Sequence, residues 1–221
     1  YSTHTTLGET NVNTDWHKVT ITGTEDTLTA YLDGVQIGSG ATNHPLAQEN
    51  GDIYIGVNFW QDMIFRGLVD DVKVYNTTAT AEEIQKDYLR DIGDMEGFKV
   101  ASYSFEDGLV NAEGAETDTA SAVVTGLGSY NGEVAYDEDG FKGSAVRLGD
   151  YGLKLNKENL GENFSVSMWL NSDSTFPENQ VLMFLGYHDP QKWIAVSGGE
   201  PGNGNSSLVK FWGKDDSVYT S

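Results

Sequence analysis

The feature that most constrains the fold of this chain is the alternation of apolar and polar residues with a period of two. It is clear in residues 17–22 (HKVTIT) and 28–32 (LTAYL), and again in residues 65–75 (FRGLVDDVKVY). Successive side chains of a strand point to opposite faces, so this pattern predicts strands that bury one face. Such strands must pair into sheets, and the sheets must cover their apolar faces.

Turn residues separate these segments, and 26 glycines are available to make the turns. Asp33-Gly34 predicts a hairpin that joins residues 28–32 to residues 35–37. Further strands are predicted at residues 53–56, 100–105, 144–148, 152–155, 164–170, 181–187, 193–196 and 208–212. About a dozen short, regularly spaced strands are typical of a β-sandwich.

One helix is predicted, and it begins with a capping box. Thr80 is the expected N-cap, and Glu83 is expected to reach back to it. The helix should end near residue 91. Three apolar residues fall on one face at helical spacing: Ile84, Tyr88 and Leu89.

Composition narrows the classes of partner. The formal charge of −21, from 34 acidic and 13 basic residues, repels phosphate groups, so neither nucleic acid nor an anionic membrane is expected as a partner. No apolar run approaches the roughly 18 to 20 residues that span a bilayer, so membrane insertion is not expected. The absence of cysteine excludes disulfides, thiol catalysis and cysteine-based zinc sites. The charge suits cations and neutral ligands, although it could serve only to keep an extracellular protein soluble.

Four motifs in the front part of the chain occur in an order that is found in a known family. They are residues 16–19 (WHKV), 28–35 (LTAYLDGV), 67–75 (GLVDDVKVY) and 80–84 (TAEEI). Together they resemble the second half of a bacterial laminin-G-like domain, a concanavalin A-like lectin/glucanase jelly roll.

The rear part resembles the first half of the same domain. Its motifs are residues 102–107 (SYSFED), 143–148 (GSAVRL) and 164–170 (FSVSMWL). The resemblance therefore implies an all-β, two-sheet antiparallel jelly-roll sandwich with one short helix, whose strands run in circularly permuted order. We expect one domain over residues 1–221, assembled from residues 1–92 and 98–221 and joined by residues 93–97.

Two other arrangements stay open. The sequence could take the end of one tandem repeat and the start of the next, or neighbouring chains could exchange strands, which buries the same surfaces. Half a sandwich would expose an apolar sheet face and open strand edges, which favours complementation within the chain. The pairing of the strands at Val72 and Tyr103 separates these possibilities.

The resemblance also implies a structural Ca²⁺ ion, because the family often holds one near the junction of its first and last strands. The matching oxygen donors are Asp70, Asp71, Glu106, Asp107 and Asn111. Asp70 has the same parity as the valines at positions 72 and 74, which are expected to face inward, and an ionised carboxylate there needs a cation or strong donors. The alternative is that Asp70 only accepts backbone N–H bonds.

Aromatic residues in loops and strands indicate a carbohydrate-binding surface, because sugar rings stack on aromatic faces while polar groups bind their hydroxyls. The candidates are Asn58, Trp60, Tyr187, His188, Trp193 and Trp212. For each of them the alternative is that it covers a loop or fills the second sheet. Trp16 and Trp169 lie in strands of the family core and are expected to be buried.

No catalytic cluster is visible in the sequence. Glucan-hydrolysing relatives carry an E-x-D-x-x-E strand, which this chain lacks, and no serine lies in a G-x-S-x-G motif. The histidines are scattered: His4, His17, His44 and His188. We therefore expect a secreted or cell-surface, non-catalytic module that binds a polysaccharide or glycan and belongs to a larger bacterial protein such as a glycoside hydrolase. The alternative is a calcium-stiffened structural or adhesion spacer of a surface protein.

Overall fold

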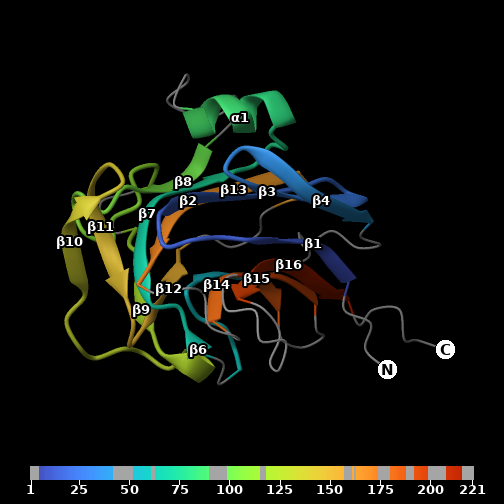
Figure 1. Ribbon diagram of the computed structural model, residues 1–221. Helices are drawn as coiled ribbons and strands as arrows, with labels where there is room; N and C mark the ends of the chain where they lie inside the picture. Colours follow the sequence, from blue (N-terminus) through green and yellow to red (C-terminus); the bar gives the residue numbers. More distant parts are fainter. Residues whose placement is uncertain are drawn as a thin grey trace.

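The computed structural model describes residues 5–41, 52–60, 63–89, 99–114, 118–156, 161, 163–173, 180–187, 192–198 and 208–215. These residues form two β-sheets that lie one above the other, with one α-helix on the outer side of the upper sheet (Figure 1). Strand pairing is antiparallel apart from one two-residue strand. The predicted fold class, an all-β two-sheet sandwich with a single short helix, is confirmed.

The lower sheet in Figure 1 is called the β5 sheet. Its strands follow the spatial order β1 (Thr5–Asn11), β16 (Leu208–Asp215), β15 (Lys192–Gly198), β14 (Gln180–Tyr187), β5 (Asp52–Ile55), β12 (Gly152–Leu155) and β9 (Ser121–Val123), with β6 (Met63–Ile64) pairing beside β14.

The upper sheet is called the β7 sheet. Its order is β10 (Ala135–Gly140), β11 (Gly143–Leu148), β7 (Gly67–Tyr75), β13 (Phe164–Ser172), β2 (Trp16–Gly23), β3 (Thr27–Leu32) and β4 (Val35–Ala41), with β8 (Lys99–Tyr103) also paired to β7.

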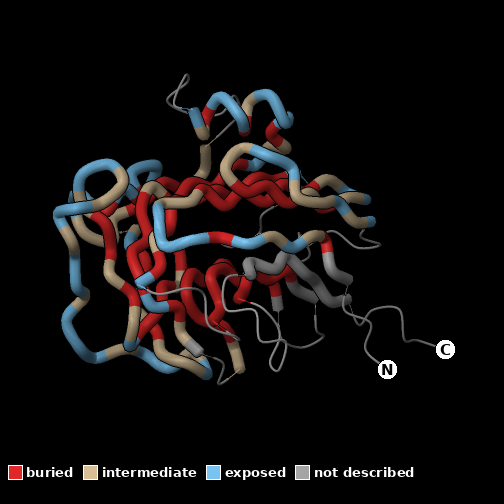
Figure 2. Tube along the Cα trace, in the orientation of Figure 1, coloured by how far each residue is buried: buried red, intermediate tan, exposed pale blue. Residues whose placement is uncertain are grey.

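The core lies between the sheets, where Figure 2 shows the buried segments facing each other. Ile53 and Ile55 of β5 belong to the same buried cluster as Val72 and Val74 of β7, and all four are fully buried. Apolar residues of both the front and the rear part of the chain join this cluster, including Met168 of β13. The alternation seen in the sequence thus places one face of each sheet away from water.

Both sheets contain strands from the front and from the rear of the chain. β7 pairs with β8, β11 and β13, and β5 pairs with β12 and β14, all within this one chain. Val72 lies directly opposite Tyr103. At the far side of the β5 sheet, β1 pairs with β16, so the first and last described strands are neighbours.

The strands that the sequence predicts are present, but four others were missed: β1, β6, β9 and β10. β10 has the sequence AYDEDG and is mostly exposed, so it carries no apolar alternation that would mark it as a strand. Its partner β11 holds it in place through backbone pairing instead.

The helix α1 (Ala81–Leu89) begins as predicted. The Thr80 N–H donates to Glu83 Oε2, and the Glu83 N–H donates to Thr80 Oγ1 at 3.2 Å. Ile84 is buried, but Leu89 is 56% exposed, so its predicted place on the buried face is wrong. Asp87 is buried instead.

Asp87 is buried because two lysines of the β7 sheet lie beneath the helix. Its carboxylate forms an ion pair with Lys18, and Lys73 Nζ lies 4.0 Å from Asp87 Oδ1 and 3.0 Å from Asp71 Oδ2. Burial lowers the pKa of Lys18, and the charge of Asp87 opposes that shift. Buried ions need partners of opposite charge, so this network ties α1 to the sheet.

Aromatic packing surrounds the same face. Trp169 is buried as predicted, but it lies beneath the helix, with its ring stacked on Phe141 at 3.5 Å and on Tyr88 at 5.6 Å between centroids. Trp16 is only partly buried and contacts Phe141 edge-on, so the prediction that it is a core residue is wrong.

Replacing Asp87 with Ala should destabilise the protein by about 3–5 kcal/mol, because the buried Lys18 would lose its counter-charge, while Lys73 would keep only Asp71. Chemical denaturation measures this change. Glu82→Ala is the matched control: it removes the exposed pair between Glu82 and Lys86 on the same helix and should have no measurable effect. Equal stability of the two variants would contradict the proposed role of the buried network.

Candidate functional site

The predicted calcium ligand Asp70 lies beside a β-bulge. Lys73 pairs with Ser167 and Asp70 pairs with Trp169, so three steps along β7 match two along β13. Asp71 takes up the extra residue with a φ of 49°. Val69 and Val72 both join the core, so Asp70 lies on the opposite face, and the prediction that it shares the inward parity of the valines is wrong.

Asp70 and Glu106 both bind the turn between β10 and β11. The Lys142 N–H donates to Asp70 Oδ2 at 2.8 Å, and the Ser144 N–H donates to Glu106 Oε1 at 2.7 Å. Gly143 between them has a φ of 80°, and a Cβ there would lie 2.0 Å from Glu106 Oε1. The turn therefore needs glycine both for its conformation and for the close approach of this carboxylate.

The other predicted ligands do not join them. Asp107 is exposed, and Asp71 pairs with Lys73. Asn111 is buried, but its side-chain oxygen accepts the N–H groups of Ser102 and Glu113. Within the described ranges, no three His, Asp or Glu side chains gather into a group that could hold a metal. Calcium requires six to eight oxygens, so these side chains as they stand do not fit a calcium cage, and the ion stays a prediction.

The pKa of Asp70 is raised to about 6, mainly by burial and to a smaller extent by the charges of Asp71 and Glu106, while backbone N–H bonds from Lys142 and Asp71 act in the opposite direction. The folded state therefore keeps this proton up to about pH 6, whereas the unfolded chain loses it near pH 3.8. Between these values the folded state binds more protons, so its stability falls as the pH rises.

We expect this group to lower the free energy of unfolding by up to roughly 3 kcal/mol between pH 4 and pH 7. Denaturant titrations in a chelating buffer, compared with those of Asp70→Asn, isolate the effect. Asp107→Asn, at an exposed neighbouring carboxylate, should keep the pH dependence of the original protein. If Asp70→Asn kept the full dependence as well, the assignment to Asp70 would be wrong.

The same denaturant titration, repeated with calcium, tests whether Asp70 binds the ion. A bound cation favours the charged carboxylate, so at a calcium site the ion would abolish the loss of stability above pH 4 and raise the melting temperature. A pH dependence that calcium does not alter would remove Asp70 from the predicted site.

Two of the predicted sugar-binding residues lie in the loop after β5. Asn58 is buried and its side-chain oxygen accepts the Trp60 N–H at 3.1 Å, which fixes a local turn. Trp60 is half-buried and meets the ring of Phe184 edge-on at 5.7 Å. Asn58 therefore positions Trp60 rather than facing solvent.

The remaining candidates are placed by their backbone alone. Tyr187 ends β14, Trp193 lies in β15 opposite Gly186, and Trp212 lies in β16 opposite Ala195. The positions of their side chains are outside the described part of the structure, as is His188 altogether.

The strand register nevertheless defines a row across the β5 sheet. Lys154 of β12 is opposite Tyr54, Tyr54 is opposite Phe184, and Phe184 is opposite Ala195. Residues directly opposite one another share a face. Tyr54, Phe184 and Ala195 belong to a cluster separate from the inter-sheet core, so this face is the outer one, on the side of the molecule away from α1 (Figure 1).

Four aromatic rings gather on this outer face and are called the aromatic platform: Tyr54, Phe59, Trp60 and Phe184. The Phe59 ring meets those of Tyr54 and Phe184 at 5.5 and 5.3 Å. Phe59 and Trp60 are partly exposed, whereas Tyr54 and Phe184 are buried beneath them.

A polar edge borders the aromatic platform. Asp52 Oδ2 accepts a hydrogen bond from the Tyr54 hydroxyl at 2.7 Å and from Lys154 Nζ at 2.9 Å. Lys154 Nζ also lies 5.8 Å from the centre of the Tyr54 ring. Sequence reasoning missed Asp52 and Lys154, although Asp52 and Tyr54 stand two apart in one strand and so share a face.

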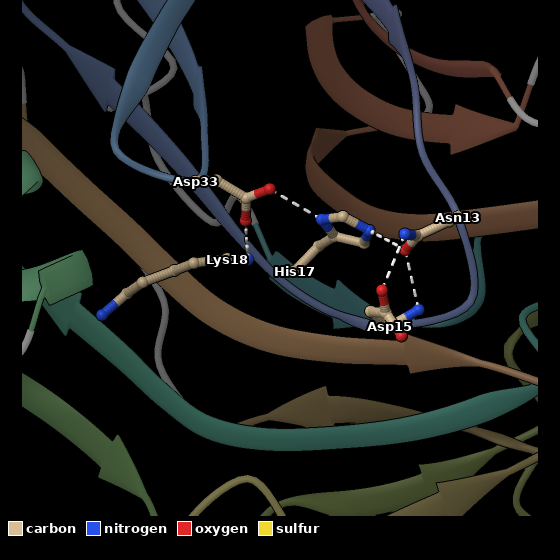
Figure 3. Close-up of polar contacts among 5 residues, drawn as sticks. All are labelled: Asn13, Asp15, His17, Lys18 and Asp33. Atoms are coloured by element: carbon tan, nitrogen blue, oxygen red, sulfur yellow. Dashed lines mark hydrogen bonds and ion pairs between the residues drawn. The ribbon is translucent and has the colours of Figure 1, made fainter.

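A second polar network surrounds His17, as Figure 3 shows. Nδ1 of His17 lies 2.7 Å from Asp33 Oδ2, and Nε2 lies 2.8 Å from Asn13 Oδ1. The Asn13 amide orientation is set by Asp15, which donates its N–H to Asn13 Oδ1 and accepts from Asn13 Nδ2. Both ring nitrogens therefore face oxygen acceptors, and the ring joins the loop before β2 to the turn after β3.

Residues 2–85 match the family model of the concanavalin A-like lectin/glucanases superfamily. This match confirms the resemblance to this superfamily for the front part of the chain. The matched residues carry β1 to β7 and the first part of α1, including the aromatic platform residues Tyr54, Phe59 and Trp60. No curated protein matches the chain. The superfamily and the two-sheet fold support a lectin-like or binding domain. In the part of the chain that is described, none of the helical structure is long and apolar enough for a membrane span.

Proposed function

We propose that the protein is a non-catalytic carbohydrate-binding module of a larger secreted bacterial protein such as a glycoside hydrolase, and that it binds polysaccharide or glycan on the outer face of the β5 sheet. The observation that carries this proposal is the aromatic platform with its polar edge of Asp52 and Lys154. A module of this kind keeps its attached catalytic domain close to the polymer, which raises the local substrate concentration.

The chemistry of the surface suits a sugar. The apolar face of a pyranose ring packs on an aromatic side chain, and its hydroxyls both donate and accept hydrogen bonds. Trp60 and Phe59 supply partly exposed aromatic rings, and Asp52 and Lys154 supply an acceptor and a donor beside them. The net charge of −21 does not act on a neutral sugar, whereas it repels an anionic polymer.

The proposal includes the order of the strands. We propose that residues 1–92 and 98–221 are the exchanged halves of one laminin-G-like domain. In a circularly permuted domain, the strands that were first and last in the original order are linked, and the new chain ends lie at another pair of neighbouring strands. The pairing of Val72 with Tyr103 supports the first point, and the pairing of β1 with β16 supports the second.

Titration with soluble polysaccharides, after a glycan array run with calcium and with chelator, tests the binding function. Trp60→Ala should weaken binding by about threefold to tenfold, the effect of one aromatic contact. Trp16→Ala is the matched control, since Trp16 is a partly buried tryptophan of the β7 sheet, and it should leave the affinity unchanged.

Combined replacement of Trp60, Trp193 and Trp212 by alanine should abolish binding while the fold, followed by circular dichroism, persists. If no glycan bound to the original protein, or if the triple variant bound as tightly as the original, the carbohydrate function would be wrong and the structural or adhesion spacer would take its place.

A further inference from the structure

A cleft of about 310 Å³ lies outside the aromatic platform, and none of the platform residues lines it. Its walls are formed by the residue before β7, the loop before β10, the end of β11 with the turn to β12, and the residue after β13. Two of the three arginines in the sequence line it, Arg66 and Arg147, together with the rings of Tyr130 and Tyr151. Because acidic residues far outnumber basic ones in this chain, two arginines in one cleft distinguish it from the rest of the surface.

Arg147 is held rigidly in the cleft wall. Its Nη1 donates to Asp173 Oδ1 and its Nη2 donates to Asp137 Oδ2, both at 2.8 Å. These two hydrogen bonds raise the pKa of Arg147, so the charged fork is permanent. Because two carboxylates already neutralise its charge, Arg147 fixes the shape of the cleft wall and adds no net positive charge to it.

Arg66 is positioned by its backbone. Its N–H donates to the buried Gln180 side chain at 3.4 Å, and its carbonyl accepts the Asp173 N–H at 3.2 Å. Its side chain is exposed, and the guanidinium has no hydrogen-bond or ion-pair partner among the residues that the structure describes. The cleft therefore holds a fixed arginine whose donors are available to a ligand.

The aromatic wall is also fixed. Tyr130 stacks on Tyr151 with 4.6 Å between ring centroids and an interplanar angle of 26°. Tyr151 is buried, and its hydroxyl accepts the Ala135 N–H at 2.9 Å. Tyr151 thus holds the half-buried Tyr130 ring in place from behind. The Tyr130 ring therefore needs no rearrangement to receive a ligand.

We infer that this cleft is a second saccharide site, which takes a single neutral pyranose unit against Tyr130, with Arg66 donating to its hydroxyl oxygens. Glu133 and Asp150, both exposed and both in the wall, accept from its hydroxyl hydrogens. This deepens the proposed function, because it gives the module a second place for the same class of ligand.

The mixed charges of the wall select a neutral ligand. A hydroxyl donates to a carboxylate and accepts from a guanidinium, so it satisfies both kinds of wall group, whereas an anion can satisfy only the arginine. The three carboxylates of the wall, Glu133, Asp150 and Asp173, outnumber the two arginines. A uronate carries a negative charge, so these carboxylates and the net negative charge of the whole chain would both repel it.

Two-dimensional amide NMR of the full chain tests the site, with D-glucose, D-galactose, D-mannose and N-acetylglucosamine as neutral probes and D-glucuronate and D-galacturonate as acidic ones. At least one neutral probe should shift the amides of residues 130–135 and 147–151, and the uronates should shift them less. Arg66→Ala changes an exposed side chain, so the fold should persist, and it should weaken binding about tenfold.

Control variants separate this site from the aromatic platform. Tyr136→Ala, at a tyrosine that is 44% exposed and does not line the cleft, should leave the shifts unchanged. Trp60→Ala should leave them unchanged too, so the cleft can bind even if the platform fails. The inference is overturned if no neutral probe shifts the cleft amides, if Arg66→Ala binds as tightly as the original, or if only the uronates bind.

Discussion

The structure depends on the pairing of front strands with rear strands. In the described part of the chain, β1, β5, β6 and β7 pair only with strands of the rear part. A strand without neighbours leaves its N–H and C=O groups unpaired, and each sheet also needs a second sheet over its apolar face. Neither part of the chain can both pair its strands and cover its apolar sheet face by itself. The core and the outer surfaces therefore both depend on the pairing of front strands with rear strands.

Both candidate binding surfaces follow from that constraint. The aromatic platform joins Tyr54, from the front of the chain, to Phe184 and Lys154, from the rear. The cleft joins Arg66 of the front to Tyr130 and Arg147 of the rear. The opposite outer face is closed by α1, whose Asp87 meets the buried lysines of the β7 sheet. The two candidate binding surfaces lie elsewhere, on the outer face of the β5 sheet and in the arginine-lined cleft.

Much of the fold could be read from the sequence because its strands bury one face. The sequences of β2 and β13 alternate apolar with polar residues, and the capping box marks the start of α1. β10 could not be found this way, since its polar residues face solvent. A single extra residue at Asp71 reversed the predicted face of Asp70, because a bulge changes parity without changing the composition of a strand.

The candidate sites were less accessible from sequence. Trp60 could be proposed because an aromatic residue in a polar loop is conspicuous, but its partner Asn58 proved to be buried. Asp52 and Lys154 meet across 102 positions, a contact that depends on the register of β5 against β12. Leu89 proved to be exposed, whereas Asp87, which the apolar pattern did not mark, is buried against Lys18 beneath the helix.

The most direct test of the interleaved sandwich is the nuclear Overhauser effect between β7 and its rear partners, measured on a mixture of differently isotope-labelled chains. The contacts of Val72 with Tyr103 and of Val74 with Val166 should appear within uniformly labelled chains and vanish when only contacts between different chains are selected. If these contacts were missing, or appeared only between different chains, the front and rear strands would not complete one another within a single molecule.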